Sequence, residues 1–432
     1  MRQGLPEADH RSVTLPSMGY GGRPRSRAGA AVRALVAVVS LAAAAHITSA
    51  FTGPATDIGR VGAQVRWLDA QLRDGTGPRM QGLFPEGDHF TSVLTGLAAA
   101  RVALATSGGA REASLLAARQ ALTELDAPRN TELFTGMSSP PGGVFFRGWR
   151  LLLLTEIARA APEGPELAEV RTEAAQLQQA FATSPTGLLE SYPGKYWPCD
   201  NVVAMAALVR ANTLLGVDGA RSAGGAWLAR TRSLRDRATG LLPHRSREDG
   251  SADEGPRGSS QALIQTFLPD LAPEEARSEW TAYTGLFVVR EAGLVGVREF
   301  PIGSAGQGDV DSGPLLLGVS LSASAVTLAA ARANGDASLA DTLDREAETF
   351  GVGLQWRGER RYALGQLPVG DAWLAWARST PVGARAVEGG SPRAWWWAYA
   401  LLALTPAVPV GLWDLAARRR RPAETEATTA VW

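Results

Sequence analysis

The residues best suited to chemistry lie in one short segment, YPGKYWPCDNVVAMAAL at 192–208. It combines two tyrosines, a tryptophan, the only cysteine, an acid and an amide with a following run of small apolar residues that predicts a helix. Pro198 suits the first turn of that helix, and Asp200 can bond its early backbone N–H groups. A helix N-terminus lowers the pKa of a thiol, so Cys199 is either a reactive nucleophile or a small buried filler. The segment predicts either a functional loop or a helix cap with aromatic packing.

Two other polar segments place acids before apolar runs. In GDVDSGPLLLGVSLSAS, at 308–324, Asp309 and Asp311 lie two residues apart. One of these carboxylates can cap a helix while the other acts as a general acid or base; two caps or a cation site is the alternative. HRSREDGSADEGPRGSSQ, at 244–261, is a polar loop in which Glu254 and Arg257 can face inward, although most of its charges should be solvated.

An internal repeat relates these segments to one another. The phrase GLFPE at 82–86 returns as GLLES at 187–191 and GLLPH at 240–244. Such loops should precede apolar helices at intervals of about 56 residues, a period typical of repeated helical hairpins. The six expected helix starts lie near His89, Arg147, Asp200, Gly258, Ser312 and Asp371.

A second and more charged helix is expected before each of these loops. In the first of them Val61, Val65 and Leu68 fall on one face, as in a helix that covers a core. The six charged helices should span roughly 57–74, 109–126, 164–183, 219–238, 272–292 and 335–350. β-Branched alternation is confined to short stretches such as 287–300. The pattern predicts an all-α fold, an (α/α)6 toroid of six helical hairpins; a generic helical bundle or an α-solenoid is the alternative.

In a toroid of this kind the N-terminal ends of the inner helices meet at one mouth. Their unpaired backbone N–H groups favour anions and developing negative charge, so polar residues at these ends are the site candidates. The predicted catalytic residues are Cys199, Asp200, Asp311, Asp88, His89 and Glu254. The predicted substrate-binding residues are Tyr192, Tyr196, Trp197, Arg147, Arg257, Asp309 and Trp373.

Several classes of function have no support in the sequence. The four histidines, His10, His46, His89 and His244, show no HxxxH or HExxH spacing, so no metal site is expected. GxGxxG after a strand, GxxxxGK[ST] and GxSxG are missing, so neither a nucleotide cofactor nor α/β-hydrolase chemistry is expected. The net charge of the chain is zero, and its ends, 1–33 and 414–432, carry +4 and +1, which leaves −5 between them. An acidic middle argues against a nucleic-acid partner.

An apolar segment lies near each end of the sequence. Residues 34–51 carry no charge and follow an arginine-rich leader at 1–33. A helix that spans a bilayer needs about 20 residues, so this segment predicts a transmembrane anchor. A signal peptide cleaved after Ala50 is the alternative, and both place the following domain outside the cytoplasm.

The second apolar segment, 394–413, has tryptophans at both ends, and aromatic rings favour the headgroup level of a bilayer. Four arginines at 418–421, in the tail at 414–432, should stay in the cytoplasm. A buried core helix is the alternative. The sequence thus predicts a protein of the cell membrane, with the lipid bilayer as partner, a cytoplasmic C-terminus and an extracytoplasmic domain at 52–390.

YWPCDN at 196–201, SGPLLLGVSLSAS at 312–324 and the hairpin count resemble the (α/α)6 linalool dehydratase-isomerases. That resemblance implies a lyase or isomerase acting on a small isoprenoid alcohol, with Cys199 at the family's helix-start cysteine and Asp88 or His89 as its polar partner. The chain is also similar to terpenoid cyclases and six-hairpin glycosidases.

The glycosidase resemblance implies a carbohydrate hydrolase or lyase. Its acid and base would come from Asp200, Glu254 and Asp311, and Trp197, Tyr196 and Trp373 would stack on sugar rings. A non-catalytic scaffold that binds envelope polymers or proteins is the third alternative. A polar, acid-lined mouth would favour sugar, and an apolar mouth would favour an isoprenoid.

Overall fold

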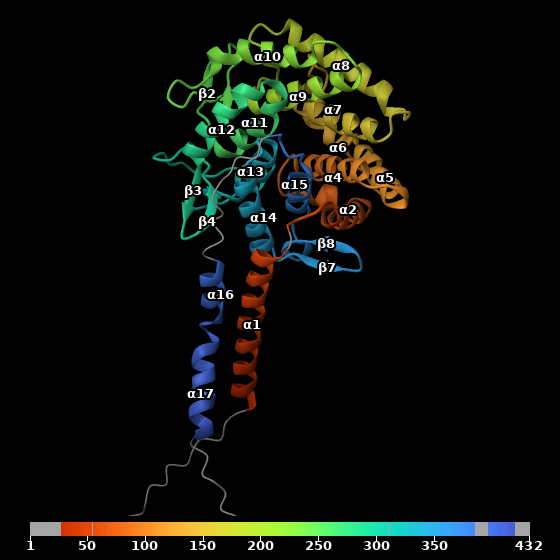
Figure 1. The fold of residues 1–432 in the computed structure, drawn as a ribbon. Helices are drawn as coiled ribbons and strands as arrows, with labels where there is room; N and C mark the ends of the chain where they lie inside the picture. The colour runs from red at the N-terminus through yellow and green to blue at the C-terminus, as the bar shows by residue number, and fades with distance from the viewer. Residues whose placement is uncertain (1–26, 54, 311, 385–395, 420–432) are drawn as a thin grey trace, which may run out of the picture. The chain divides into compact units, whose positions relative to one another are not determined.

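The computed structural model describes residues 27–53, 55–310, 312–384 and 396–419 (Figure 1). Most of the predicted leader, the end of the predicted tail and Asp311 lie outside the described residues. The chain divides into two units. One holds the described residues up to Ala45 and from Ala400 onward, and the other is His46–Tyr399.

The smaller unit contains most of each predicted membrane segment, whereas residues 46–51 and 396–399 belong to the larger unit and 394–395 lie outside the described residues. Helix α1 (Arg27–Thr52) includes a stretch, Ala28–Thr52, that is long and apolar enough to cross a membrane. Helices α16 (Trp396–Leu404) and α17 (Ala407–Arg419) meet this criterion only as a pair, with a bend of 42°. The bend falls at Pro406, which lacks an N–H and disfavours helical backbone before it.

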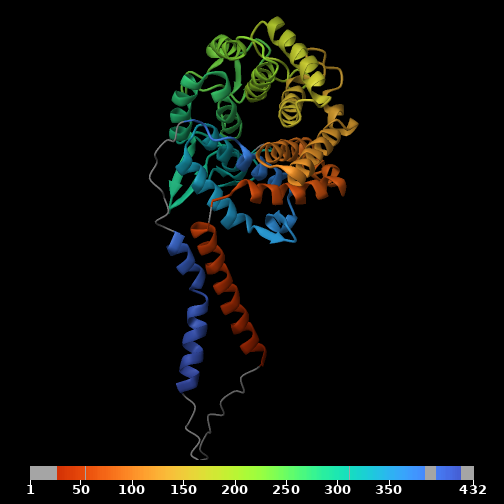
Figure 2. The ribbon, with the colours of Figure 1, turned by 45° about the vertical axis from the view of Figure 1, so that its right-hand side comes forward.

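The larger unit is built mainly from helices, which confirms the all-α prediction. Six apolar helices are buried on nearly all sides: α4 (Gly87–Ala105), α7 (Gly143–Ala160), α9 (Pro198–Leu214), α11 (Gly258–Leu271), α13 (Leu321–Ala333) and α15 (Pro368–Ser379). Each contacts the next along the chain, and α15 also contacts α4, so the contacts return to their start (Figure 2). We call these the inner helices.

Six other helices, which are more exposed, alternate with the inner helices along the chain. They are α2 (Ile58–Arg73), α5 (Gly108–Leu125), α8 (Glu166–Thr183), α10 (Ala220–Arg230), α12 (Pro273–Phe287) and α14 (Ala337–Gly351). In α2 the predicted apolar face, with Val61, Val65 and Leu68, is buried. Asp57 caps this helix by accepting a hydrogen bond from the backbone N–H of Arg60 at 2.9 Å. One-sided burial of this kind explains why these helices carry their charges on the other face.

Short elements fill the connections. They are α3 (Thr76–Gln81), α6 (Pro128–Thr131), and the 3₁₀ turns η1 (Glu132–Phe134), η2 (Thr231–Leu234) and η3 (Ala363–Gly365). Four antiparallel hairpins pair β1 (Arg245–Ser246) with β2 (Ala252–Glu254), β3 (Val288–Glu291) with β4 (Leu294–Val297), β5 (Leu315–Leu316) with β6 (Val319–Ser320), and β7 (Leu354–Trp356) with β8 (Glu359–Arg361). The expected helix start at Ser312 is therefore wrong, because a hairpin precedes α13.

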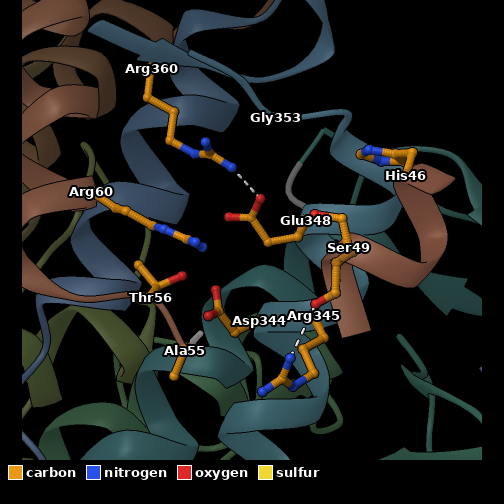
Figure 3. Close-up of a pocket in the computed structure, with 11 residues that line it drawn as sticks. His46, Ser49, Ala55, Thr56, Arg60, Asp344, Arg345, Glu348, Gly353 and Arg360 are labelled. Atoms are coloured by element: carbon orange, nitrogen blue, oxygen red, sulfur yellow. Dashed lines mark hydrogen bonds and ion pairs between the residues drawn. The ribbon is translucent and has the colours of Figure 1, made fainter. Parts of the chain in front are cut away.

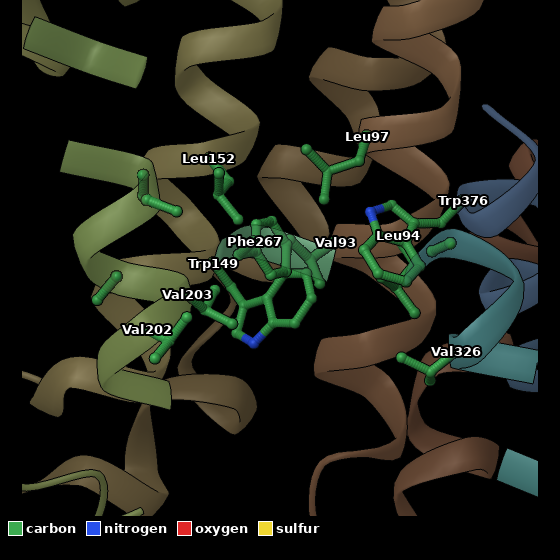
Figure 4. Close-up of a cluster of buried hydrophobic side chains, with 14 of the residues drawn as sticks. Val93, Leu94, Leu97, Trp149, Leu152, Val202, Val203, Phe267, Val326 and Trp376 are labelled. Carbon is green, nitrogen blue, oxygen red and sulfur yellow. The ribbon is translucent and has the colours of Figure 1, made fainter. Parts of the chain in front are cut away.

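Aromatic and aliphatic side chains fill the space between the inner helices (Figure 4). The ring centroids of Trp149, Phe267 and Trp376 lie 5.8–6.1 Å apart, and all three side chains are fully buried. Close approach of the helices needs small residues at their contacts. A Cβ atom at Gly148 of α7 would lie 2.8 Å from the Cβ of Ala204 on α9, so only glycine permits this separation.

The buried carboxyl group of Glu346 gives the fold a pH dependence. It accepts a hydrogen bond from the backbone N–H of Val295 at 2.7 Å, and burial raises its pKa to about 7. A carboxyl group whose pKa is higher in the folded state favours folding when protonated, so the free energy of unfolding should fall as pH rises from about 4.5 to 7.

Glutamine at this position should remove that effect, since its amide oxygen still accepts the hydrogen bond without charge. We expect Glu346→Gln to stabilise the protein at pH 8 by on the order of 3 kcal/mol and to have little effect at pH 4, as measured by denaturant unfolding. An equal effect of the substitution at both pH values would contradict this assignment.

Candidate functional site

A cavity of about 400 Å³ opens at the N-terminal ends of the inner helices. Every inner helix contributes to its wall from its first two turns: Phe90 from α4, Phe145 from α7, Cys199 and Asp200 from α9, Ser259, Ser260 and Leu263 from α11, Ser322 and Val326 from α13, and Trp373 from α15. Its volume lies within the range of about 300–1,000 Å³ that is usual for small-molecule sites. We call it the mouth cavity.

Most of the wall of the mouth cavity is apolar and aromatic. The rings of Phe90 and Trp373 lie 4.8 Å apart, and that of Tyr192 lies 5.6 Å from Phe145 and 5.4 Å from Trp197. Aliphatic side chains complete this surface, notably Leu263, Val310 and Val326, with Phe84 from the loop before α4. Such a wall suits a ligand with a hydrophobic body and few polar groups.

Two adjacent residues in the first turn of α9 bring reactive groups to this wall. Cys199 and Asp200 are both buried, and the thiol donates a weak hydrogen bond to the Asp200 carboxylate, with Sγ 3.7 Å from Oδ1. Trp197 occupies the N-cap position of α9, without a side-chain hydrogen bond, and Asp200 is the acidic residue of the first turn. The neighbouring Asn201 fixes the loop, through hydrogen bonds with the backbone of Leu189 at 2.7 and 3.1 Å.

A second acid reaches the cavity from the loop before α4. The hydroxyl group of Tyr192 donates a hydrogen bond to Glu86 Oε1 at 2.6 Å, and both residues line the mouth cavity. Glu86 lies in the repeated loop GLFPE, where the sequence marked the position but not the pairing. A tyrosine bonded to a carboxylate can pass a proton to or from a ligand.

His244 and Lys195 also line the mouth cavity, and sequence reasoning missed both. Burial, with a smaller contribution from the Arg257 cation, lowers the pKa of His244 to about 3. Its imidazole is therefore neutral at physiological pH and can exchange hydrogen bonds with a ligand without adding charge. The signal for Lys195 was present, because the only lysine of the chain lies between the two tyrosines of the loop.

An ion-pair network lies beside the cavity, and it contains three of the predicted residues. The buried guanidinium of Arg257 donates to Glu299 Oε1 at 2.7 Å and to Glu254 at 3.2 Å, and it also pairs with Asp309. Glu299 accepts a hydrogen bond from the Ser259 hydroxyl at 2.8 Å, and Ser259 lines the cavity. Arg257, Glu254 and Asp309 thus contact the site through Ser259 and do not form its wall.

Four other predicted residues also lie away from the wall. Asp88 is fully buried and pairs with Arg129, and Arg147 donates to the Pro141 carbonyl at 2.6 Å. Tyr196 donates to Glu190 at 3.4 Å. His89 packs 4.6 Å from the Phe145 ring, burial lowers its pKa to about 3, and neither of its nitrogens bonds to a described residue. In these surroundings the four side chains have structural contacts rather than access to the cavity.

The remaining predicted residues are brought together. Cys199, Asp200, Tyr192, Trp197 and Trp373 all line the mouth cavity. Asp311 lies outside the described residues. Among the residues that the structure does describe, no group of three or more histidine, cysteine, aspartate or glutamate side chains could hold a metal ion.

Comparison with known proteins adds no relative. No protein-family model matches the sequence, and no curated protein is significantly similar to it. The functional argument therefore rests on the mouth cavity.

Proposed function

We propose that residues 46–384 form an (α/α)6 toroid and that its mouth cavity converts a small isoprenoid alcohol by elimination of water or by isomerisation. The contacts of the inner helices support the toroid, since each inner helix touches the next and the last touches the first. The outer helices alternate with them along the chain, as six hairpins require.

The observation that carries the proposed substrate class is the apolar wall of the mouth cavity. Hydroxyl-rich sugars need many polar partners, whereas here aromatic and aliphatic residues form most of the surface. The rings of Phe90, Trp197 and Trp373 could also stabilise positive charge that develops on carbon as a C–O bond breaks. An isoprenoid alcohol, with one hydroxyl group and a branched hydrocarbon body, fits both properties.

The polar groups supply the acid and the base of such a reaction. In our proposal Asp200 acts as the general acid: its carboxyl group transfers a proton to the alcohol oxygen, the C–O bond breaks, and water leaves. Glu86, bonded to Tyr192, accepts a proton from the carbon next to the cationic centre, so that the C–H electrons form the new double bond. The Cys199 thiol positions the acid through its hydrogen bond to Asp200. Neutral His244 binds the hydroxyl group.

We further propose that α1 and the pair α16 and α17 cross the cell membrane, with the toroid outside the cytoplasm. The length and composition of Ala28–Thr52 support the first span, and Arg418–Arg421 support a cytoplasmic C-terminus. A protease-protection assay on spheroplasts tests this orientation. Digestion of a C-terminal tag from outside would reject it.

Direct turnover measurements test the proposed reaction. The full chain in detergent should convert a ten-carbon tertiary or allylic isoprenoid alcohol to its diene or isomer, detected by gas chromatography. Leu263→Lys, which places a charge in the apolar wall, should lower turnover at least about 100-fold. Leu263→Met nearly conserves the volume and should retain most of it. Release of sugar from an oligosaccharide by the same preparation, with no conversion of the alcohol, would replace this proposal by the glycosidase alternative.

A further inference from the structure

A second cavity, of about 170 Å³, lies where the C-terminal end of α1 meets α2 and α14 (Figure 3). It is separate from the mouth cavity and shares none of its residues. Three arginines line it, namely Arg60, Arg345 and Arg360, together with the acids Asp344 and Glu348. A small space with this lining suits a small charged group.

All but one of the cations around this cavity have an acidic partner. Arg345 pairs with Asp341 at 3.0 Å, and Arg360 pairs with Glu348. The buried Arg378, which is not part of the cavity wall, bonds to Asp344 at 2.6 Å and to Glu348 at 2.7 Å. Both acids of the wall are thus already compensated by arginines.

Arg60 is the remaining cation. Its guanidinium points into the cavity (Figure 3), and it forms no side-chain hydrogen bond or ion pair with any residue that the structure describes. A half-buried guanidinium with five N–H donors is well matched to the oxygens of a phosphate group.

The cavity is also joined directly to the end of the apolar helix α1. Arg345 donates hydrogen bonds to two backbone carbonyl groups in the last turn of α1, that of Ala50 at 3.1 Å and that of Phe51 at 2.7 Å. His46 bonds to the carbonyl of Thr349 at 3.0 Å. Because Ala28–Thr52 has the length and composition of a membrane span, its end lies at the depth of the lipid headgroups if it crosses the bilayer.

Exposed aromatic side chains occur on the segments that follow the cavity residues of α14. Phe350, at the end of α14, is 66% exposed, and Trp356, at the tip of the β7–β8 hairpin, is 69% exposed. Tryptophan and arginine side chains near the end of a membrane span are typical of the headgroup layer. A phosphate group that reaches this cavity would therefore come from a lipid rather than from solution.

We propose that the cavity between α1, α2 and α14 binds the phosphate of a membrane phospholipid headgroup, with Arg60 as its principal ligand. The lipid thereby holds the larger unit at the surface of the bilayer. This site is independent of any reaction in the mouth cavity, and its test needs no turnover.

Titration calorimetry of the full chain in detergent tests the site with three probes: dihexanoyl phosphatidylglycerol, dihexanoylglycerol and inorganic phosphate. The phospholipid should bind at least tenfold more tightly than either of the other two. Arg60→Gln should weaken its binding about tenfold, the usual effect of losing one charge-assisted contact. Arg73→Gln, at the exposed end of the same helix, should bind like the wild type.

Equal binding of inorganic phosphate would overturn the lipid assignment, and equal binding of dihexanoylglycerol would overturn the role of phosphate. Unchanged phospholipid binding by Arg60→Gln would reject Arg60 as a ligand. Arg60→Lys provides the check on folding, because it keeps the charge but not the planar fork. It should bind with an affinity between those of the wild type and Arg60→Gln, and affinity as low as that of Arg60→Gln in a folded Arg60→Lys protein would count against a phosphate site.

Discussion

Asp200→Asn is expected to lower turnover of the isoprenoid alcohol by about 10²–10⁴-fold without changing the helical circular dichroism spectrum. Asparagine has nearly the same shape but cannot donate an acidic proton, and proton transfer by a positioned side chain typically contributes a factor of this size. The fold should tolerate the change, since Asn201 holds the loop to the start of α9.

The matched control is Asp218→Asn, an exposed aspartate in the loop after the other end of α9. It carries the same change in charge and should leave turnover unchanged. Cys199→Ala should cost less than Asp200→Asn, because the thiol positions the acid and does not transfer the proton. Full activity in a folded Asp200→Asn protein would remove Asp200 from the chemistry and favour a non-catalytic binding scaffold.

The sequence could predict the helices because their burial pattern is local. Val61, Val65 and Leu68 recur at helical spacing, and α2 buries all three. The same logic failed before α13, where LLLGVS at 315–320 contains the apolar residues of a helix but forms the β5–β6 hairpin. Leu317 and Gly318 adopt φ values of 52° and 83°, and a turn of two positive-φ residues is the usual hairpin connection. Apolar content alone does not reveal such a turn.

The mouth cavity could be predicted only in part, for a related reason. Residues in the first two turns of a helix, such as Asp200 and Trp373, follow directly from the expected helix starts. The positions of Glu86, Lys195 and His244 depend instead on how three loops fold over the helix ends. Asp88 was predicted to be a catalytic residue, but it forms an ion pair with Arg129, which is 41 residues away in the sequence. Because the two residues are so far apart along the chain, only the folded structure shows this pairing.

Arg378→Met is expected to lower the free energy of unfolding by about 3–5 kcal/mol at neutral pH, the usual cost of removing one partner from a buried ion pair. Arg378 is buried on α15 and bonds to Asp344 and Glu348, and its guanidinium lies 4.8 Å from the Tyr362 ring. Methionine fills a similar volume but leaves two buried carboxylates with less compensation. Arg232→Met, which removes an exposed pair with Glu275, should cost no more than about 1 kcal/mol.

The pH dependence of this loss separates charge from packing. In the wild type, burial raises the pKa of Asp344, but the Arg378 cation and hydrogen bonds outweigh burial and hold that pKa below its usual value. Without Arg378, burial should raise the pKa of Asp344 above its value in the unfolded chain. The stability of Arg378→Met is then retained below about pH 4, where Asp344 is protonated in the folded and the unfolded states, and lost as pH rises through the folded-state pKa of Asp344.

Unfolding of Arg378→Met in denaturant at pH 4 and pH 8 should therefore show the larger loss of stability, relative to the wild type, at pH 8. Glu348→Gln in the Arg378→Met background should recover part of this loss. A deficit of the same size at both pH values would mean that Arg378 contributes through packing and not through its charge.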